Sequence, residues 1–222
     1  MIDNLKGIMF DMDGTVLDSE GLFDDAQLLL LKDYGVSSNK DQLKEFKGMS
    51  YKHFYPRFIK KFQIIGDIDS IRLRLRTYLY NIMKKKLKFI DGFEDFFTSN
   101  ILGTNIKVAL VTNTTRLSYE KIQSCINIDD YFNFVITVNE AKEPKPSPEP
   151  YLQAMESLSL SENETIIIED SRTGLISAVK SNAHVIGITT SLSVSQIKQI
   201  DQKILIADSY NDISNYLKGF NY

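Results

Sequence analysis

The sequence is poor in the features that mark secreted and membrane proteins. It has a single cysteine, Cys125, which rules out an internal disulfide framework and fits a reducing compartment. No apolar run approaches the length of a membrane span, and the first residues lack the basic segment and apolar core of a signal peptide. We therefore predict a cytoplasmic protein that does not enter a membrane.

Glycine and proline are also scarce, with 11 and 5 among 222 residues, while 43% of the residues are hydrophobic. These values are ordinary for a globular protein, and the length allows one or two domains. The net charge of -3 gives no reason to expect a nucleic-acid partner.

The charge is divided unevenly along the chain. Residues 17–88 hold 15 lysines and arginines and 9 acidic residues, a net of +6, whereas the remainder holds 11 and 20, a net of -9. A basic lobe inserted into an acidic one could attract an anionic substrate. A solvated, lysine-rich helical surface explains the same residues without a ligand.

Short apolar runs predict a buried sheet. The first is Gly7–Phe10, and five more are rich in isoleucine and valine and do not alternate, as expected when both faces of a sheet are covered. These five are Ile106–Val111, Phe134–Thr137, Thr165–Ile168, His184–Ile188 and Ile204–Ala207. Helical stretches between them, such as Leu117–Ile126 and Gly174–Ser181, indicate an α/β fold with a doubly wound parallel sheet.

Residues 17–88 break this alternation of strands and helices. They contain long mixed segments such as Gly21–Tyr34 and Lys52–Phe62, the first with a helical period. Ile71–Arg76 alternates like a strand, but Tyr78 and Ile82 continue its apolar residues at helical spacing, so we predict a helix there. The sequence thus predicts a core of residues 1–16 and 89–222 with an inserted helical cap at 17–88.

The first candidate site contains Asp11 and Asp13, directly after the first predicted strand. Ligands of open α/β sheets bind at this carboxyl edge, and two buried acids are costly unless a cation or a proton is shared. Asp11 could attack phosphorus and form an acyl phosphate, while Asp13 could protonate the leaving oxygen and later activate water. The alternative is a pair of surface acids near a turn.

The second candidate site is Val111-Thr112-Asn113-Thr114-Thr115, which follows the second predicted strand and leads into a helix predicted to begin at Leu117. Hydroxyls and free amide groups at a helix N-terminus bind phosphate oxygens. An ordinary threonine-rich N-cap would have the same sequence.

The third candidate site is Lys145, in a loop whose residues 144, 146, 148 and 150 are all proline. Prolines stiffen the loop, and a fixed ammonium could neutralise a phosphate and an attacking carboxylate together. The alternative is a rigid linker with Lys145 in solvent.

The fourth candidate site is Glu169 and Asp170, where another predicted strand ends in acids. Carboxylate oxygens beside a phosphate suit magnesium, with Asp170 as the direct ligand and Glu169 acting through water. Asp170 as a helix N-cap is the alternative. Because the carboxyl ends of parallel strands share one edge, all four sites can meet there.

In this order the residues resemble the four motifs of the haloacid dehalogenase superfamily of phosphotransferases. Asp11-x-Asp13-Gly14-Thr15 matches the first motif, Thr112 the second, Lys145-Pro146-x-Pro148 the third and Glu169-Asp170 the fourth. The inserted segment resembles the cap of subfamily I, and Lys47-Gly48-Met49-Ser50 resembles that of β-phosphoglucomutase and phosphoglycolate phosphatase relatives. The resemblance implies a Rossmann-like core.

The resemblance also implies a role for each core residue. Asp11 would be the nucleophile and Asp13 the acid/base, while Thr112 and Lys145 would bind phosphate with a main-chain contact from Asn113. Mg²⁺ would be held by Asp11, the Asp13 carbonyl and Asp170.

We therefore expect a magnesium-dependent phosphatase that acts on a small phosphorylated metabolite, such as a sugar phosphate, with Lys52, His53 and Arg57 of the cap facing it. A phosphosugar mutase is a second interpretation, but the mutase pattern has histidine where Phe23 stands and arginine where Tyr51 stands. A phosphorylated receiver-type signalling domain is an alternative of another class. The cap-sized insertion argues against it.

Overall fold

The computed structural model describes residues 5–46 and 51–219, without the side chains of Glu20, Tyr51 and Lys52. The chain forms two compact units: Met1–Asp18 together with Lys88–Tyr222, and Ser19–Leu87. Our sequence prediction drew the limits of the inserted segment at residues 17 and 88.

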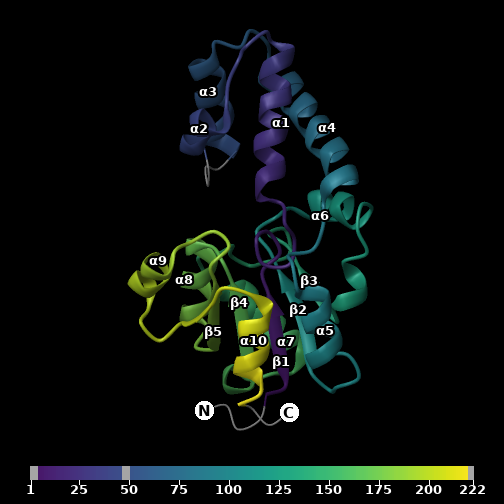
Figure 1. Cartoon of the computed structure of the whole chain (residues 1–222), viewed down its shortest axis with the longest axis vertical. Helices are drawn as coiled ribbons and strands as arrows, with labels where there is room; N and C mark the ends of the chain where they lie inside the picture. The colour runs from purple at the N-terminus through teal and green to yellow at the C-terminus, as the bar shows by residue number, and fades with distance from the viewer. Residues whose placement is uncertain (1–4, 47–50, 220–222) are drawn as a thin grey trace. The chain divides into compact units, whose positions relative to one another are not determined.

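A six-stranded parallel sheet forms the centre of the first unit (Figure 1). Its strands are β1 (Gly7–Phe10), β2 (Lys107–Val111), β3 (Phe134–Ile136), β4 (Thr165–Glu169), β5 (His184–Ile188) and β6 (Leu205–Ala207). The order β3-β2-β1-β4-β5-β6 puts β1 between β2 and β4, and ligands of such sheets bind outside the strand ends where the order reverses. The predicted doubly wound α/β sheet is confirmed.

The helices of this unit cover the sheet on both faces. They are α5 (Phe93–Asn100), α6 (Arg116–Gln123), α7 (Glu149–Leu158), α8 (Arg172–Lys180), α9 (Val194–Ile200) and α10 (Tyr210–Leu217), with the 3₁₀ helices η2 (Asp129–Tyr131) and η3 (Glu162–Glu164). Met9 belongs to the core that α7, α8 and α9 share with the sheet. Its neighbour Phe10 instead contacts Phe93 and Phe96 of α5 edge-on, with ring centroids 5.8 and 6.2 Å apart. Both faces of β1 are therefore covered, which explains its unbroken apolar sequence.

The second unit is helical. It comprises α1 (Glu20–Asp33), α2 (Lys40–Leu43), the 3₁₀ helix η1 (Lys44–Phe46), α3 (Tyr51–Phe62) and α4 (Ile68–Lys86). α4 begins after Asp67, whose side chain accepts a hydrogen bond from the Ser70 N–H at 2.8 Å. The segment Ile71–Arg76 lies inside α4, so the helix predicted there is confirmed.

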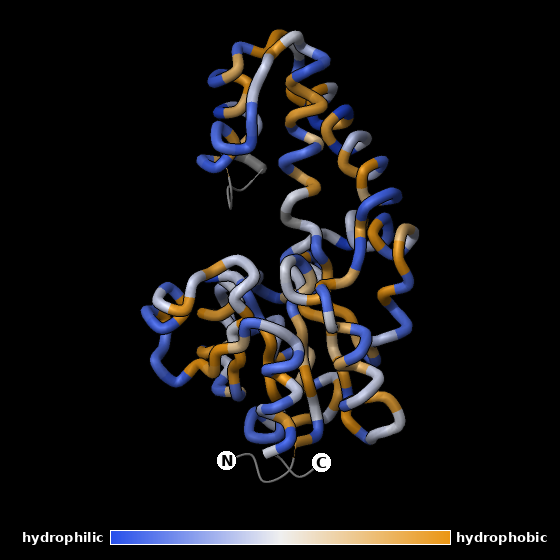
Figure 2. The backbone as a smooth tube through the Cα atoms, viewed as in Figure 1, coloured by the Kyte–Doolittle hydropathy of each residue, from blue (hydrophilic) through white to orange (hydrophobic). Residues whose placement is uncertain are grey.

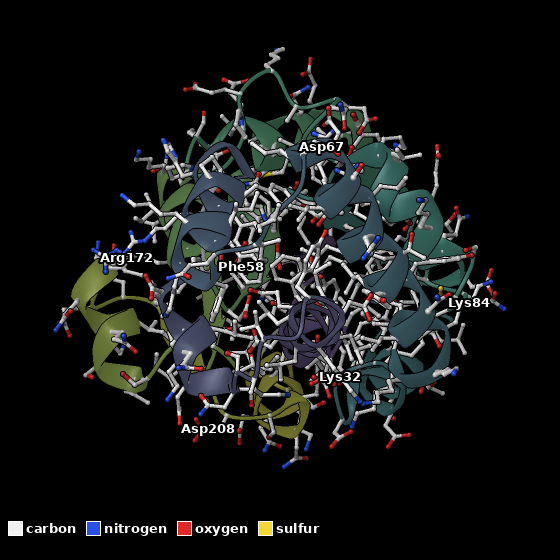
Figure 3. All side chains as sticks on the ribbon, turned by 90° about the horizontal axis from the view of Figure 1, so that it is seen from above. Lys32, Phe58, Asp67, Lys84, Arg172 and Asp208 are labelled. Atoms are coloured by element: carbon white, nitrogen blue, oxygen red, sulfur yellow. The ribbon has the colours of Figure 1, made fainter. Side chains whose placement is uncertain are left out.

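Apolar side chains hold these helices together. α1 packs along α4, and Figure 2 shows hydrophobic positions recurring along both. Phe58 of α3, labelled in Figure 3, is fully buried and lies 5.1 Å from the Phe54 ring and 5.3 Å from the Phe46 ring. Lys84 of α4 is exposed. None of the helices in the described ranges has both the length and the apolar character needed to cross a membrane.

Candidate active site

Asp11 lies at the carboxyl end of β1, one residue beyond the strand. Its N–H donates to the Ile168 carbonyl of β4 at 3.0 Å, which brings the ends of the two strands together. The chain then turns sharply, because the N–H groups of Val16 and Leu17 both donate to the Met12 carbonyl, at 3.0 and 2.9 Å. Asp11 is only 7% exposed, so it is not a surface acid.

Gly14 lets this turn approach the loop that follows β4. Its φ is +82°, and a Cβ there would lie 2.1 Å from Asp170 Oδ2, so both the backbone and the space require glycine. Asp170 is buried. Its Oδ1 accepts a hydrogen bond from Thr15 Oγ1 at 3.3 Å, and its Oδ2 accepts one from the Ser191 hydroxyl.

Lys145 comes from the proline-rich loop after β3 and is 5% exposed. Its Nζ donates to Asp11 Oδ1 and Glu169 Oε1, both at 2.6 Å, and to the Val111 carbonyl at 2.7 Å. The Tyr151 ring lies 4.9 Å from the same nitrogen. The alternative of a solvated lysine in a rigid linker is therefore wrong.

Burial and charge act in opposite directions on the pKa of Lys145. Burial alone would lower it, but the attraction of Asp11 and Glu169 holds the pKa above its ordinary value, so the ammonium stays charged. Burial raises the pKa of Asp11 well above its ordinary value. The charge of Glu169 adds to this rise and Lys145 opposes it. A cation next to Asp11 would favour its ionised form.

Glu169 is the last residue of β4 and is completely buried. Its Oε1 accepts hydrogen bonds from Lys145 Nζ and from the Tyr151 hydroxyl, the latter at 3.0 Å. Its Oε2 accepts from the Asp170 N–H and from the N–H and hydroxyl of Ser171, each at 3.1 Å. Protein groups therefore already engage both oxygens of this carboxylate.

The start of α8 is shaped around Glu169. The N-cap of α8 is Ser171, which accepts a hydrogen bond from the Gly174 N–H at 3.1 Å. The alternative of Asp170 as the helix N-cap is therefore wrong. A Cβ on Gly174 would lie 1.6 Å from Glu169 Oε1, so only glycine leaves room for the carboxylate in its observed place.

Asn113 holds the backbone of Lys145. Its Nδ2 donates to the Lys145 carbonyl at 3.0 Å, and its Oδ1 accepts from the Lys145 N–H at 3.1 Å. This reciprocal pair ties the loop after β2 to the proline-rich loop after β3. The sequence predicted only a main-chain contact for Asn113 and gave no sign of this side-chain interaction.

Thr112 and Thr114 lie in the same loop. Thr112 is buried, and its Oγ1 accepts from the Thr114 N–H at 3.0 Å. The Thr114 hydroxyl donates to Asp13 Oδ2 at 2.9 Å, which links this loop to the turn after β1. The N-cap of α6 is Thr115, which accepts from the Ser118 N–H, so the N-cap interpretation applies to Thr115 and not to Thr112.

Asp11, Glu169 and Asp170 form a buried group that can hold a metal ion. Each offers a carboxylate oxygen within 4.8 Å of the others. Lys145 is paired with two of these three carboxylates, so negative charge remains to be neutralised. Carboxylate oxygens are the ligands of hard divalent cations such as Mg²⁺.

The residues predicted to face a substrate from the cap belong to α3. His53 and Arg57 are exposed, and Arg57 pairs with Glu45 of η1, with Nη2 and Nε at 2.9 and 3.1 Å from Oε2. The side chain of Lys52 and the whole segment 47–50 lie outside the described residues. A substrate contact by these residues stays a prediction.

Several polar partners of the site were missed by the sequence analysis. They include Tyr151, Thr190 and Ser191. The Thr190 Oγ1 donates to the Gly14 carbonyl at 2.6 Å. Thr190 and Ser191 follow β5, whose carboxyl end lies on the same edge as those of β1 and β4. The rule that brought the four motifs together could therefore have found these two.

Comparisons with known proteins agree with the motifs. A family model described as haloacid dehalogenase-like hydrolase matches residues 8–188. The chain is 24% identical over 191 residues to the phosphorylated carbohydrates phosphatase of Thermotoga maritima, covering 85% of this chain and 88% of that protein. It is also 24% identical over 187 residues to the phosphoglycolate phosphatase of Nitrosospira multiformis, covering 82% of each.

The fold has close counterparts among solved structures. A crystal structure from Thermotoga maritima, described as a candidate beta-phosphoglucomutase, superposes with a TM-score of 0.85 at 23% identity and covers 97% of this chain and 99% of its own. At this identity the likeness concerns the fold. The family match favours a hydrolase over the receiver-domain alternative. On the evidence of its motifs, its sheet and the family match across most of its length, the chain belongs to the haloacid dehalogenase-like hydrolase family.

Proposed function

We propose that this protein is a magnesium-dependent phosphatase that hydrolyses a small phosphorylated metabolite, such as a sugar phosphate, through a phosphoryl group carried on Asp11. The observation that carries the proposal is the buried contact of Lys145 with Asp11 and Glu169, beside Asp170. Family membership supports hydrolysis. The relatives named as phosphatases support a phosphate ester as substrate.

The donor set supports a magnesium site. Asp11 and Asp170 would hold the ion together with the main-chain carbonyl of Asp13. Glu169 is better suited to orient Lys145. Its Oε1 accepts from Lys145 and Tyr151, and its Oε2 accepts from two N–H groups and a hydroxyl, which leaves these oxygens little capacity for a metal ion. Bound Mg²⁺ would act as a Lewis acid and offset the charge of the phosphate next to these carboxylates.

Asp11 begins the proposed reaction. Lys145 holds its Oδ1 at 2.6 Å, which keeps the carboxylate in one orientation as it attacks phosphorus. Asp13 gives a proton to the leaving oxygen while the phosphorus–oxygen ester bond breaks, so an alcohol departs and Asp11 carries the phosphoryl group. Thr114 orients Asp13 for this transfer through its hydrogen bond to Oδ2.

Water completes the turnover. Asp13, now ionised, takes a proton from a water molecule that attacks phosphorus, and the bond between phosphorus and Asp11 breaks to release inorganic phosphate. In both halves the charge of Lys145, the hydroxyl of Thr112 and the main chain at Asn113 would stabilise the phosphoryl oxygens.

The second unit is proposed to act as the cap that selects the substrate. The net charge of +6 over residues 17–88 supports an anionic ligand. Lys52, His53 and Arg57 are the proposed contacts, and Arg57 would have to exchange Glu45 for the substrate. The single cysteine supports a reducing, cytoplasmic compartment.

A phosphosugar mutase is the second candidate, because Lys47-Gly48-Met49-Ser50 resembles the cap of β-phosphoglucomutase relatives. A mutase would pass the phosphoryl group from Asp11 to a second sugar hydroxyl instead of water. Phe23, where the mutase pattern has histidine, is half-buried and packs against the apolar core of the second unit, with its ring 5.4 Å from that of Phe54. An apolar side chain packed here departs from the mutase pattern, and this departure supports hydrolysis. A requirement for a sugar bisphosphate during turnover would favour the mutase.

The test is phosphate release from a broad panel of phosphorylated metabolites with Mg²⁺, with and without a chelator. We expect hydrolysis that needs Mg²⁺, and a loss of at least about a thousandfold in Asp11→Asn. Asp95→Asn is the matched control, because Asp95 is an exposed residue of α5. The proposal fails if no phosphomonoester is hydrolysed or if Asp11→Asn stays active.

A further inference from the structure

Two consecutive hydroxyl residues after β5, Thr190 and Ser191, reach the candidate metal site from a loop that none of the four motifs includes. The Ser191 hydroxyl donates to Asp170 Oδ2, and the Thr190 hydroxyl donates to the Gly14 carbonyl at 2.6 Å. One short segment therefore contacts both the carboxylate after β4 and the turn after β1.

The three loops are packed closely at this point. A Cβ on Gly14 would lie 3.2 Å from Ser191 Oγ as well as 2.1 Å from Asp170 Oδ2. Thr15, also in the turn after β1, donates from Oγ1 to Asp170 Oδ1 at 3.3 Å. Hydroxyls from two different loops therefore hold the two oxygens of Asp170, and its carboxylate has a defined orientation.

The segment is anchored on both sides, which allows it to position other groups. Before it, Thr189 donates from its N–H to the Ala207 carbonyl at 3.0 Å and from its hydroxyl to Asp208 Oδ1 at 2.6 Å. After it, Ser193 caps α9 in a reciprocal capping box with Gln196.

We propose that Thr190 and Ser191 are positioning residues of the metal site: Ser191 orients the Asp170 carboxylate, and Thr190 fixes the turn that carries Asp13. The inference rests on the proposed function, because it concerns the same metal site. Residues that hydrogen-bond to metal ligands commonly contribute about 10- to 100-fold to metal affinity. A hydroxyl that only held a surface loop in place would leave that affinity unchanged.

The test is a Mn²⁺ titration of the purified full-length protein, with free Mn²⁺ measured by electron paramagnetic resonance and Mn²⁺ standing in for Mg²⁺. We expect Ser191→Ala to raise the dissociation constant for Mn²⁺ about tenfold and Thr190→Val to raise it by a smaller factor. Ser191→Thr, which keeps the hydroxyl, should restore binding. Ser195→Ala, an exposed hydroxyl in α9, should bind as the wild type does.

The outcomes separate this inference from the proposed function. Unchanged or tighter Mn²⁺ binding by Ser191→Ala overturns the inference and leaves phosphatase activity to be judged by phosphate release. Weakened binding that Ser191→Thr restores, in a protein that hydrolyses no phosphate ester, supports the inference and contradicts the proposed function. Failure of the wild type to bind Mn²⁺ overturns both.

Discussion

Replacing Lys145 by methionine tests the electrostatics of the site. The change keeps the length of the side chain and removes the ammonium from between Asp11 and Glu169, whose side chains are 11% and 0% exposed. Removing one partner of a buried ion pair costs about 3–5 kcal/mol, because the remaining charge is left without compensation. With two carboxylates affected, we expect a loss of at least about 3 kcal/mol in the free energy of unfolding.

The measurement is urea unfolding followed by circular dichroism, in the presence of a chelator. Lys142→Met is the matched control, since Lys142 lies in the same loop with a 69% exposed side chain and its Nζ is 3.9 Å from Glu149. Such a surface pair contributes at most about 1 kcal/mol. Equal stability of Lys145→Met and Lys142→Met would refute the buried charge arrangement described above.

Three further predictions concern neighbouring groups. Asn113→Ala should lower kcat/KM for the best phosphate ester at least about tenfold by releasing the Lys145 backbone; unchanged kinetics would contradict this. Gly174→Ala, which puts a Cβ 1.6 Å from Glu169 Oε1, should lower the urea midpoint by an amount equivalent to about 1–3 kcal/mol, and a wild-type midpoint would speak against the packing. Glu140 accepts hydrogen bonds from Arg116, and these lower the pKa of its carboxyl group from 4.5 to about 2. The ionised carboxylate therefore stabilises the fold above pH 4.5, and this stabilisation is lost as the pH falls toward 2. After allowance for the exposure of the Glu140 side chain, Glu140→Gln should be about 1 kcal/mol less stable than the wild type at neutral pH. It should also lose less of its free energy of unfolding as the pH falls toward 2. If the stability of the two proteins fell in parallel in acid, this role of Glu140 would be excluded.

The sheet could be predicted because its signal is local. Each strand is a short run of apolar residues covered on both faces. Every predicted run begins and ends within one residue of the bounds of the observed strand. The helix α5 has no such signal, since aromatic, threonine and asparagine residues favour helices weakly. Tertiary contacts fix it instead: Phe93 and Phe96 are buried, and Asn100 Nδ2 donates to Ser214 Oγ of α10 at 3.1 Å.

The candidate site could be predicted as far as the main chain determines it. Parallel strands end at one edge, so Asp11, Lys145 and Asp170 were expected to meet, and the contacts of Lys145 and Gly14 bring them together. The partners of Glu169 were not predictable, because they depend on side-chain directions and loop paths that leave no periodic pattern. The loop after β5, which supplies Ser191 to Asp170, could have been found by the same rule of parallel strand ends.

The central claim is that Asp11, Thr112, Lys145 and Asp170 surround one phosphoryl group. It is tested most directly by a crystal structure of the protein with Mg²⁺ and beryllium trifluoride, which mimics a phosphoryl group on a carboxylate. We predict the fluoride adduct on Asp11, with the metal ion bound to Asp11 and Asp170 and with fluorine atoms facing Lys145 and Thr112. An adduct on Asp13, or a metal ion bound away from Asp170, would contradict the account.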